Sequence, residues 1–209
     1  MKAEIKLILW DFGGVLTKSP IKKFLEYEKD SGVEPGTIVK INSHNSFNNA
    51  WAKLEKNLIN KKQFTQLFLE EAKKIEISCK LDIEKLLNCL DLELNTEMVN
   101  YFLKIRKKFP CACLTNNISE SIKPKINIHF KKFKKYFSFS FESSKLGLRK
   151  PEKEIYEYVL DTLNLRPENI LFLDDLGINL KPAKAIGFKT YKVINNEDTK
   201  LYLNKLLGL

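Results

Sequence analysis

The sequence predicts an α/β fold, in which a Rossmann-like parallel sheet core is flanked by helices and an all-helical cap is inserted after the first strand. Short, continuously apolar runs end abruptly in a polar residue, helical patterns separate these runs, and one long interval contains helical patterns almost without strands. Continuous apolarity is typical of strands buried on both faces of a parallel sheet. The alternation of strands and helices indicates the α/β class.

Apolar runs predict strands at five places: Ile5–Trp10, Cys111–Leu114, Tyr136–Phe141, Ile170–Leu173 and Thr190–Ile194. In the third run Phe alternates with Ser, so a less buried strand is expected there. Helical spacing separates the runs. Met98, Phe102 and Ile105 predict a helix before the second strand, and Ile155 and Val159 predict one before the fourth.

The interval 18–95 breaks this rhythm, because its apolar residues follow helical spacing. Its stripes are Trp51, Leu54 and Leu58, then Phe64, Leu67 and Phe68 after a helix-capping Asn60, then Leu81–Leu90. We expect a core domain formed by residues 1–17 and 96–209 and a helical cap domain formed by residues 18–95. The alternative is that these helices extend one common core.

Length and composition indicate a globular chain. Its 209 residues fit one large domain or a domain with an insert, and a hydrophobic content of 44% excludes collagen-like and wholly disordered chains. The four cysteines, Cys79, Cys89, Cys111 and Cys113, form no C-x-x-C pair, so reduced and buried thiols are expected. No apolar stretch approaches the roughly 18 residues that span a membrane, and we expect a cytoplasmic protein without a membrane partner.

The net charge is +10, and nearly all basic residues are lysines. Lysine is a hydrated point charge, whereas arginine provides the planar fork that suits bases and phosphates. The densest basic run, Lys131–Lys135, is interpreted as a solvated face, so nucleic acid is not expected as a partner. The basic surface could still attract anionic small molecules.

Polar residues follow three of the predicted strands: Asp11, Thr115, and the pair Asp174 and Asp175. Because the carboxyl ends of parallel strands meet at one edge of a sheet, we expect these side chains to converge. A single strand-end aspartate is more often a helix cap, but converging carboxylates repel one another unless a cation lies between them. Hard oxygen ligands suit Mg²⁺, which also leaves a position for a substrate phosphate. Together with Lys150, these residues predict a magnesium and phosphate site.

Four ordered segments resemble the motifs of the haloacid dehalogenase superfamily, which consists mostly of aspartate-nucleophile phosphohydrolases: Leu9–Val15, Leu114–Asn117, Lys150–Pro151, and Phe172–Asp175 with Asn179. A more specific similarity is to the N-terminal phosphatase domain of soluble epoxide hydrolases, through Phe141–Ser144, Gly147–Pro151 and Leu171–Ala183. The helical insert resembles the cap of that family, which closes over the substrate.

The resemblance implies a role for each residue. Asp11 would attack phosphorus and form an aspartyl-phosphate, which divides one difficult displacement into two easier ones. Thr115 would donate its hydroxyl to a phosphoryl oxygen, and Asn116 and Gly13 would contact the substrate. Lys150 would neutralise the charge shared by the nucleophile and the phosphoryl group.

The resemblance also implies a Mg²⁺ site formed by Asp11, Asp174, Asp175 and the backbone carbonyl of Gly13. Gly13 departs from the family pattern, because phosphatases usually have a second aspartate there that protonates the leaving group. Such a general acid contributes about 10² to 10⁴ in rate. We therefore expect a Mg²⁺-dependent phosphohydrolase for a small phosphorylated metabolite, slow or selective for good leaving groups because the general acid position is vacant.

Two other functions are compatible with the sequence. The missing acid favours a phosphate-ligand binding module with negligible turnover. A 2-haloacid dehalogenase needs no proton donor, but dehalogenases of this family use an arginine soon after the nucleophile, and the first arginine here is Arg106. His44 and His129 match no metal-binding spacing and are interpreted as ordinary surface or hydrogen-bonded histidines. The sequence does not predict the oligomeric state.

Overall fold

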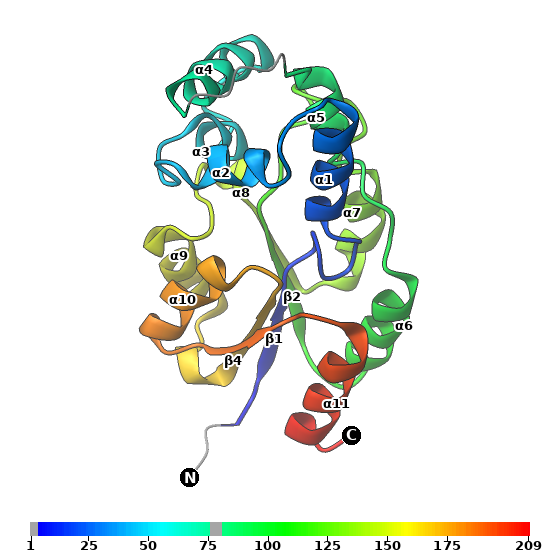
Figure 1. Cartoon of the computed structure of the whole chain (residues 1–209). Helices are drawn as coiled ribbons and strands as arrows, with labels where there is room; N and C mark the ends of the chain where they lie inside the picture. The colour runs from blue at the N-terminus through cyan, green and yellow to red at the C-terminus, as the bar shows by residue number, and fades with distance from the viewer. Residues whose placement is uncertain (1–3, 76–80) are drawn as a thin grey trace.

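The computed structural model describes residues 4–75 and 81–209 (Figure 1). Its centre is a five-stranded sheet in the order β3-β2-β1-β4-β5, and every strand pair is parallel. The strands are β1 (Leu7–Trp10), β2 (Cys111–Thr115), β3 (Phe139–Glu142), β4 (Ile170–Asp174) and β5 (Lys189–Lys192). The predicted α/β class is confirmed.

The observed strand boundaries agree best with the predicted ones where both faces of the strand are covered by helices. β1, β2 and β4 are buried throughout, as their continuous apolar runs predict. At the two edge strands, β3 and β5, the apolar runs extend beyond the observed strands. Tyr136 ends a short 3₁₀ helix (Lys134–Tyr136), and Ile194 lies beyond β5 with 78% of its surface exposed. Edge strands have one neighbour, so loops replace the ladder sooner than apolarity alone suggests.

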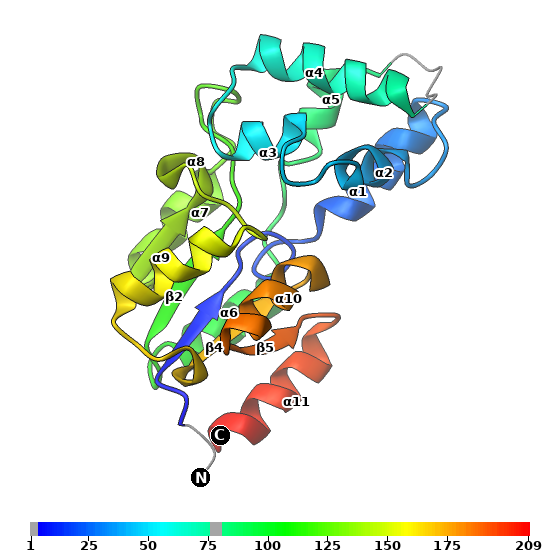
Figure 2. The same ribbon diagram turned by 90° about the vertical axis from the view of Figure 1, so that its left-hand side faces the viewer.

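Helices cover both faces of the sheet, as Figures 1 and 2 show. One face packs against α9 (Lys153–Leu163) and α10 (Gly177–Ile186), and the other against α6 (Thr96–Ile105), α7 (Ile128–Phe133) and α11 (Asn196–Leu207). Short turns α8 (Ser143–Leu146) and η2 (Pro167–Asn169) connect the layers. The expected helices at 98–105 and 155–163 are therefore present.

Cysteines belong to the buried layer, as predicted. Cys111 and Cys113 lie on one side of β2, facing the α6 layer, whereas Ala112 faces the other. Cys89, Cys111 and Cys113 are free and buried, and burial raises the pKa of Cys111 to about 12. Cys79 lies outside the described residues.

A group of five helices lies above the carboxyl ends of the strands (Figure 1). They are α1 (Pro20–Asp30), α2 (Thr37–Ser43), α3 (Ala50–Glu55), α4 (Lys61–Lys74) and α5 (Ile83–Asn88). Phe24, Trp51, Phe64 and Phe68 form the aromatic centre of a buried cluster. Ile118 and Ile122, which follow β2, also belong to this cluster. The predicted cap at Asn60 is confirmed, because its side chain and that of Gln63 form a reciprocal capping box.

One predicted stripe residue is wrong. Leu58 continues the spacing of Trp51 and Leu54, but α3 ends at Glu55 and Leu58 is 63% exposed. Asn57 has a positive φ of 56°, so the chain has already left the helix where the periodicity would place Leu58.

The two connections between the helical group and the sheet lie side by side. Thr17 and Leu94 form an isolated antiparallel bridge. The Lys18 N–H donates to the Glu93 carbonyl at 2.8 Å, and the Asn95 N–H donates to the Leu16 carbonyl at 2.9 Å. The chain thus leaves and re-enters the sheet layer at one point.

The densest basic run lies on the surface, as expected. Lys131, Lys132, Lys134 and Lys135 are all exposed, around the half-buried Phe133. Among the described residues, no helix has the length and apolarity needed to cross a membrane.

Candidate active site

The carboxyl edge of the sheet brings the strand-end residues together. β1 lies between β2 and β4, with Trp10 in register with Leu173. The Asp11 N–H donates to the Leu173 carbonyl at 2.9 Å, so Asp11 and Asp174 leave the sheet side by side. Thr115 ends the neighbouring strand β2 and is also buried.

Lys150 lies between the two aspartates. Its Nζ is 2.9 Å from Asp11 Oδ1 and 2.7 Å from Asp174 Oδ2, and its side chain is buried. Burial alone would lower the pKa of Lys150, but the two carboxylates raise it above its ordinary value. The ammonium therefore stays charged, and the structure distinguishes this lysine from the many on the surface.

Asp174 is anchored from several directions. Its Oδ1 accepts hydrogen bonds from the Leu176 N–H at 2.8 Å and from Asn179 Nδ2 at 3.0 Å. The Tyr156 hydroxyl donates to the Asn179 carbonyl at 2.6 Å and so ties α10 to α9. Since Asp174 is fully buried, these donors replace the water that would otherwise solvate the carboxylate.

Three carboxylates form a compact cluster. Asp11, Asp174 and Asp175 each offer an oxygen within 4.8 Å of the others. Burial raises the pKa of Asp11 well above its ordinary value; Lys150 opposes this shift, and the other two aspartates add to it. Burial, reinforced by Asp174, raises the pKa of Asp175 to about 6. Ionising the whole cluster is therefore unfavourable without further positive charge.

The two glycines after Asp11 differ in their surroundings. Gly14 has a φ of +75°, and a Cβ there would lie 2.2 Å from Asp175 Oδ2. Glycine is required at that position because the Asp175 carboxylate occupies the space of a side chain. A Cβ at Gly13 would meet nothing within 4 Å, although this residue lines the same cavity.

The loop after β2 is fixed mainly by asparagines. The Asn116 side chain exchanges two hydrogen bonds with the backbone of Lys150, each of 2.9 Å. The Asn117 side chain accepts from the N–H and the hydroxyl of Ser144, at 3.1 and 2.9 Å, and the Asn117 N–H donates to Ser143 Oγ at 2.9 Å. These bonds fix the loop that follows Thr115, the last residue of β2.

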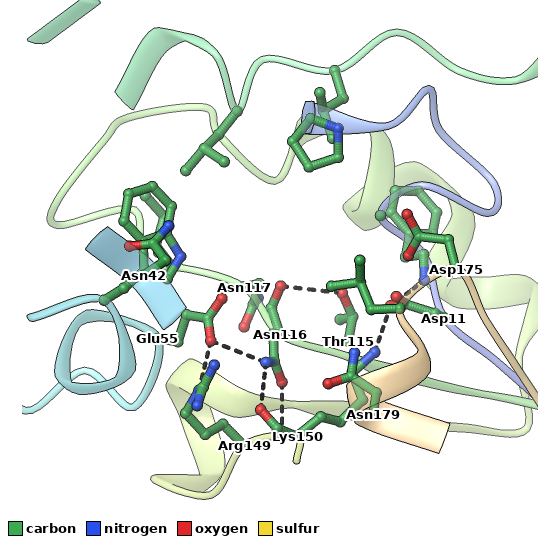
Figure 3. Close-up of a pocket in the computed structure, with 18 of the residues that line it drawn as sticks. Asp11, Asn42, Glu55, Thr115, Asn116, Asn117, Arg149, Lys150, Asp175 and Asn179 are labelled. Carbon is green, nitrogen blue, oxygen red and sulfur yellow. Dashed lines mark hydrogen bonds and ion pairs between the residues drawn. The ribbon is translucent and has the colours of Figure 1, made fainter. Parts of the chain in front are cut away.

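A cavity of about 430 Å³ lies between this edge and the helical group (Figure 3). Asp11, Thr115, Lys150 and Asp175 line its sheet side. The opposite wall combines apolar and polar side chains. The apolar ones include Ile21, Phe24, Val39, Trp51, Leu90 and Leu92, and the polar ones include Asn42, Ser43 and Asn49. The arrangement suits a molecule with one anionic end and a less polar body.

Several polar residues that sequence reasoning did not place there also line the cavity, and three of them can carry charge: Glu55, Arg149 and His129. Glu55 ends α3, Arg149 precedes Lys150, and His129 lies in the first turn of α7. Arg149 is one of only three arginines and belongs to the GLRKP segment, which is a usable signal. Glu55 and His129 carry no motif, so only the tertiary fold reveals them.

The haloacid dehalogenase-like hydrolase family model matches residues 5–187, a range that includes every strand-end residue described above. The chain belongs to this family. The resemblance seen in the sequence is therefore confirmed, and the helical insertion after β1 agrees with the cap of such hydrolases.

Curated relatives of this haloacid dehalogenase-like chain have several names. Acyl-CoA dehydrogenase family member 10 of Mus musculus is 33% identical over 97% of this chain and 19% of its own length. Bifunctional epoxide hydrolase 2 of Rattus norvegicus is 36% identical over 55% of this chain and 21% of its own. D-ribitol-5-phosphate phosphatase of Bacteroides thetaiotaomicron is 27% identical over 56% of this chain and 58% of its own length. This chain thus spans about a fifth of the first curated relatives it matches.

A solved structure has the same fold. A family enzyme from Bacteroides thetaiotaomicron, in complex with magnesium and inorganic phosphate, superposes with a TM-score of 0.60 over 93% of this chain and 98% of that one, at 23% identity. At this identity the likeness concerns the fold.

The donor set of this hydrolase fits Mg²⁺. Three carboxylates offset by one buried ammonium leave a net negative site, and carboxylate oxygens are the hard ligands that Mg²⁺ prefers. Asp11 and Asp175 line the cavity, whereas Asp174 lies buried beneath them. The part predicted for the Gly13 carbonyl stays a prediction.

Proposed function

We propose that this chain is a Mg²⁺-dependent phosphohydrolase that acts on a small phosphorylated metabolite through an aspartyl-phosphate on Asp11. The observation that carries the proposal is the convergence of Asp11, Thr115, Lys150 and Asp175 on one wall of the cavity between the sheet and the insert. A nucleophile, a hydroxyl donor, a buried ammonium and a metal-suited carboxylate are the parts that phosphoryl transfer requires.

Asp11 serves as the nucleophile. An Asp11 carboxylate oxygen forms a bond to phosphorus as the bond from phosphorus to the ester oxygen breaks, and the leaving group departs with that electron pair. Water then attacks the phosphorus of the aspartyl-phosphate, releases phosphate and restores the carboxylate. Lys150, 2.9 Å from Asp11 Oδ1, favours the ionised carboxylate against the effect of burial and stabilises the charge that builds up beside it.

Thr115 and Asn116 bind the phosphoryl oxygens, through the hydroxyl of the first and the backbone amide of the second. Asp11 and Asp175, with Asp174 buried behind them, would hold a Mg²⁺ ion, which would supply positive charge to the phosphoryl oxygens. Gly13 contributes no proton donor, so the leaving group takes its proton from solvent or from the substrate itself. Good leaving groups are therefore favoured.

The insert, residues 18–95, acts as a cap that selects the organic part of the substrate. Support comes from a buried cluster formed largely by the insert and distinct from those on the two faces of the sheet, and from the bridge between Thr17 and Leu94, where both connections meet. The apolar wall formed by Ile21, Phe24 and Val39 favours an alkyl or aryl body over a sugar.

The proposal is tested by phosphate release from acetyl phosphate, p-nitrophenyl phosphate and several sugar phosphates, with Mg²⁺ or with EDTA. We expect activity that requires Mg²⁺ and falls by about 10⁴-fold or more in Asp11→Asn, because the variant lacks the nucleophile. Circular dichroism of both proteins provides the control for folding. No phosphate release by the folded wild type would contradict the proposal.

One alternative has its own observation. Because Gly13 provides no acid, a phosphate-ligand binding module with negligible turnover would have the same anionic-ligand cavity. Binding of phosphorylated metabolites by calorimetry, without any phosphate release, would favour that function.

A further inference from the structure

One carboxylate of the insert contacts residues of the candidate active site at the carboxyl edge of the sheet. Glu55, the last residue of α3, points between Arg149 and Asn116 (Figure 3). Its Oε2 accepts from Arg149 Nε at 2.6 Å and from Asn116 Nδ2 at 2.9 Å. The side chains of Glu55 and Arg149 are only 12% and 11% exposed, so water can replace few of these bonds.

Asn116 carries this contact to the reacting groups. The same amide that donates to Glu55 also donates to the Lys150 carbonyl at 2.9 Å, and its Oδ1 accepts from the Lys150 N–H at 2.9 Å. The Lys150 ammonium in turn contacts Asp11. Hydrogen bonds thus link the insert to the Lys150 backbone, and the side chain of Lys150 extends from there to the nucleophile.

Arg149 holds Glu55 in place from the other side. Besides its bond to Glu55, the guanidinium donates through Nη1 to the Ser46 carbonyl at 3.1 Å. Ser46 also belongs to the insert and lines the cavity. Arg149 thus makes two direct contacts with the insert, and Lys150 is the next residue in the chain.

A neighbouring ion pair offers a natural comparison. Lys56 and Glu152 also join the insert to the sheet layer, at 2.7 Å, with side chains 18% and 14% exposed. Within the described part of the chain, neither of these side chains has another hydrogen-bond partner, and neither lines the cavity. This pair holds the insert without touching the site.

We propose that Glu55 is a positioning residue: it couples the seating of the insert to the placement of Asn116 and Lys150, so that the phosphate site is complete only when the insert is seated. The inference rests on the proposed function and goes beyond it, because it assigns a role in phosphoryl transfer to a residue of the insert. Glu55 acts through Asn116 and touches no reacting atom.

The test compares two double variants. In Glu55→Met/Arg149→Met the buried pair is replaced by apolar side chains, a change that proteins often tolerate. Lys56→Met/Glu152→Met is the matched control. We expect kcat with p-nitrophenyl phosphate to fall about 10- to 100-fold in the first variant, as misplacement of catalytic groups commonly does. The control should stay within about twofold of the wild type, since its pair does not contact the site.

A second readout does not depend on turnover. Calorimetric titration with inorganic phosphate in Mg²⁺ should show weaker binding in Glu55→Gln and in the first double variant, and unchanged binding in the control. Equal losses in both double variants, or a rise in KM with an unchanged kcat, would overturn the inference. If the wild type releases no phosphate, the proposed function fails, and phosphate binding alone then decides the role of Glu55.

Discussion

The two walls of the cavity are built in opposite ways. On the sheet side, Asp11, Lys150 and Asp174 are buried charges, and each has a partner within 2.9 Å. On the insert side, α1 and α2 contribute mainly apolar side chains such as Phe24 and Val39. The first wall is organised for charge and fixed geometry, whereas the second is organised for shape. Substitutions of the apolar residues of α1 and α2 should therefore change the choice of substrate and leave the sheet-side charges in place, whereas Glu55 is the point at which the two walls are coupled.

The largest effect is expected from restoring a carboxylate on the sheet side. Gly13→Asp should raise kcat for alkyl phosphates by about 10² to 10⁴, because a general acid can protonate a poor leaving group. The substitution is sterically possible, since a Cβ at Gly13 meets nothing within 4 Å. The measurement is the ratio of alkyl to aryl phosphate turnover.

Gly14→Asp is the control for this substitution, because a side chain there collides with Asp175 and should abolish activity. A Gly13→Asp protein that binds Mg²⁺ and shows no gain would mean that leaving-group protonation is not limiting.

The buried carboxylates on the sheet side of the cavity should also make the free energy of unfolding depend on pH when Mg²⁺ is removed. The pKa of Asp175 is raised from 3.8 to about 6, so its contribution is fully present below about pH 4 and is lost as pH rises through 6. In EDTA, the free energy of unfolding should fall by up to about 3 kcal/mol between pH 4 and pH 7 relative to Asp175→Asn.

Urea unfolding of the wild type and of Asp175→Asn, each with EDTA and with Mg²⁺, measures this difference. Mg²⁺ should remove it, because a bound cation offsets the repulsion. Identical pH profiles for the two proteins in EDTA would contradict the assignment.

Substitution of an apolar residue on the insert side of the cavity should change KM and leave kcat unchanged. Val39→Asn should raise KM for pentyl phosphate about fivefold, because part of a valine's burial energy is lost, and should leave glycerol 3-phosphate unchanged. Both substrates have alkoxide leaving groups, so the comparison isolates the wall. Leu58→Asn is the control, since Leu58 belongs to the insert but is exposed away from the cavity. An equal rise for both substrates would show that Val39 does not select the organic group.

The smallest effect is expected at His129. Its imidazole makes no hydrogen bond or ion pair with any residue in the described ranges, although it lines the cavity. His129→Gln should change kcat less than about twofold for every substrate, as substitutions outside the working groups commonly do. A loss confined to alkyl phosphates would show instead that this imidazole replaces the acid missing at Gly13.

The sequence by itself determined the sheet and the residues at its edge. Local apolarity predicts β1, β2 and β4, because strands covered on both faces need apolar side chains throughout. The polar residue after each strand then marks the site, since parallel topology brings strand ends to one edge. The weaker edge strands and Leu58 were misplaced where solvent, rather than a core, lies beside the chain.

Only the tertiary structure decided what faces that edge. Glu55 lies more than sixty positions before Asn116 in the chain, and no local pattern distinguishes it from the other acidic residues of the insert. His129 shows the same limit, because helical spacing alone does not reveal that it lines a cavity. The reactive residues at the strand ends lie in short sequence motifs. The opposite wall of the cavity, in contrast, is formed by helices whose orientation depends on packing across the whole molecule. For that reason the reaction class can be predicted from the sequence, and the contacts that complete the site cannot.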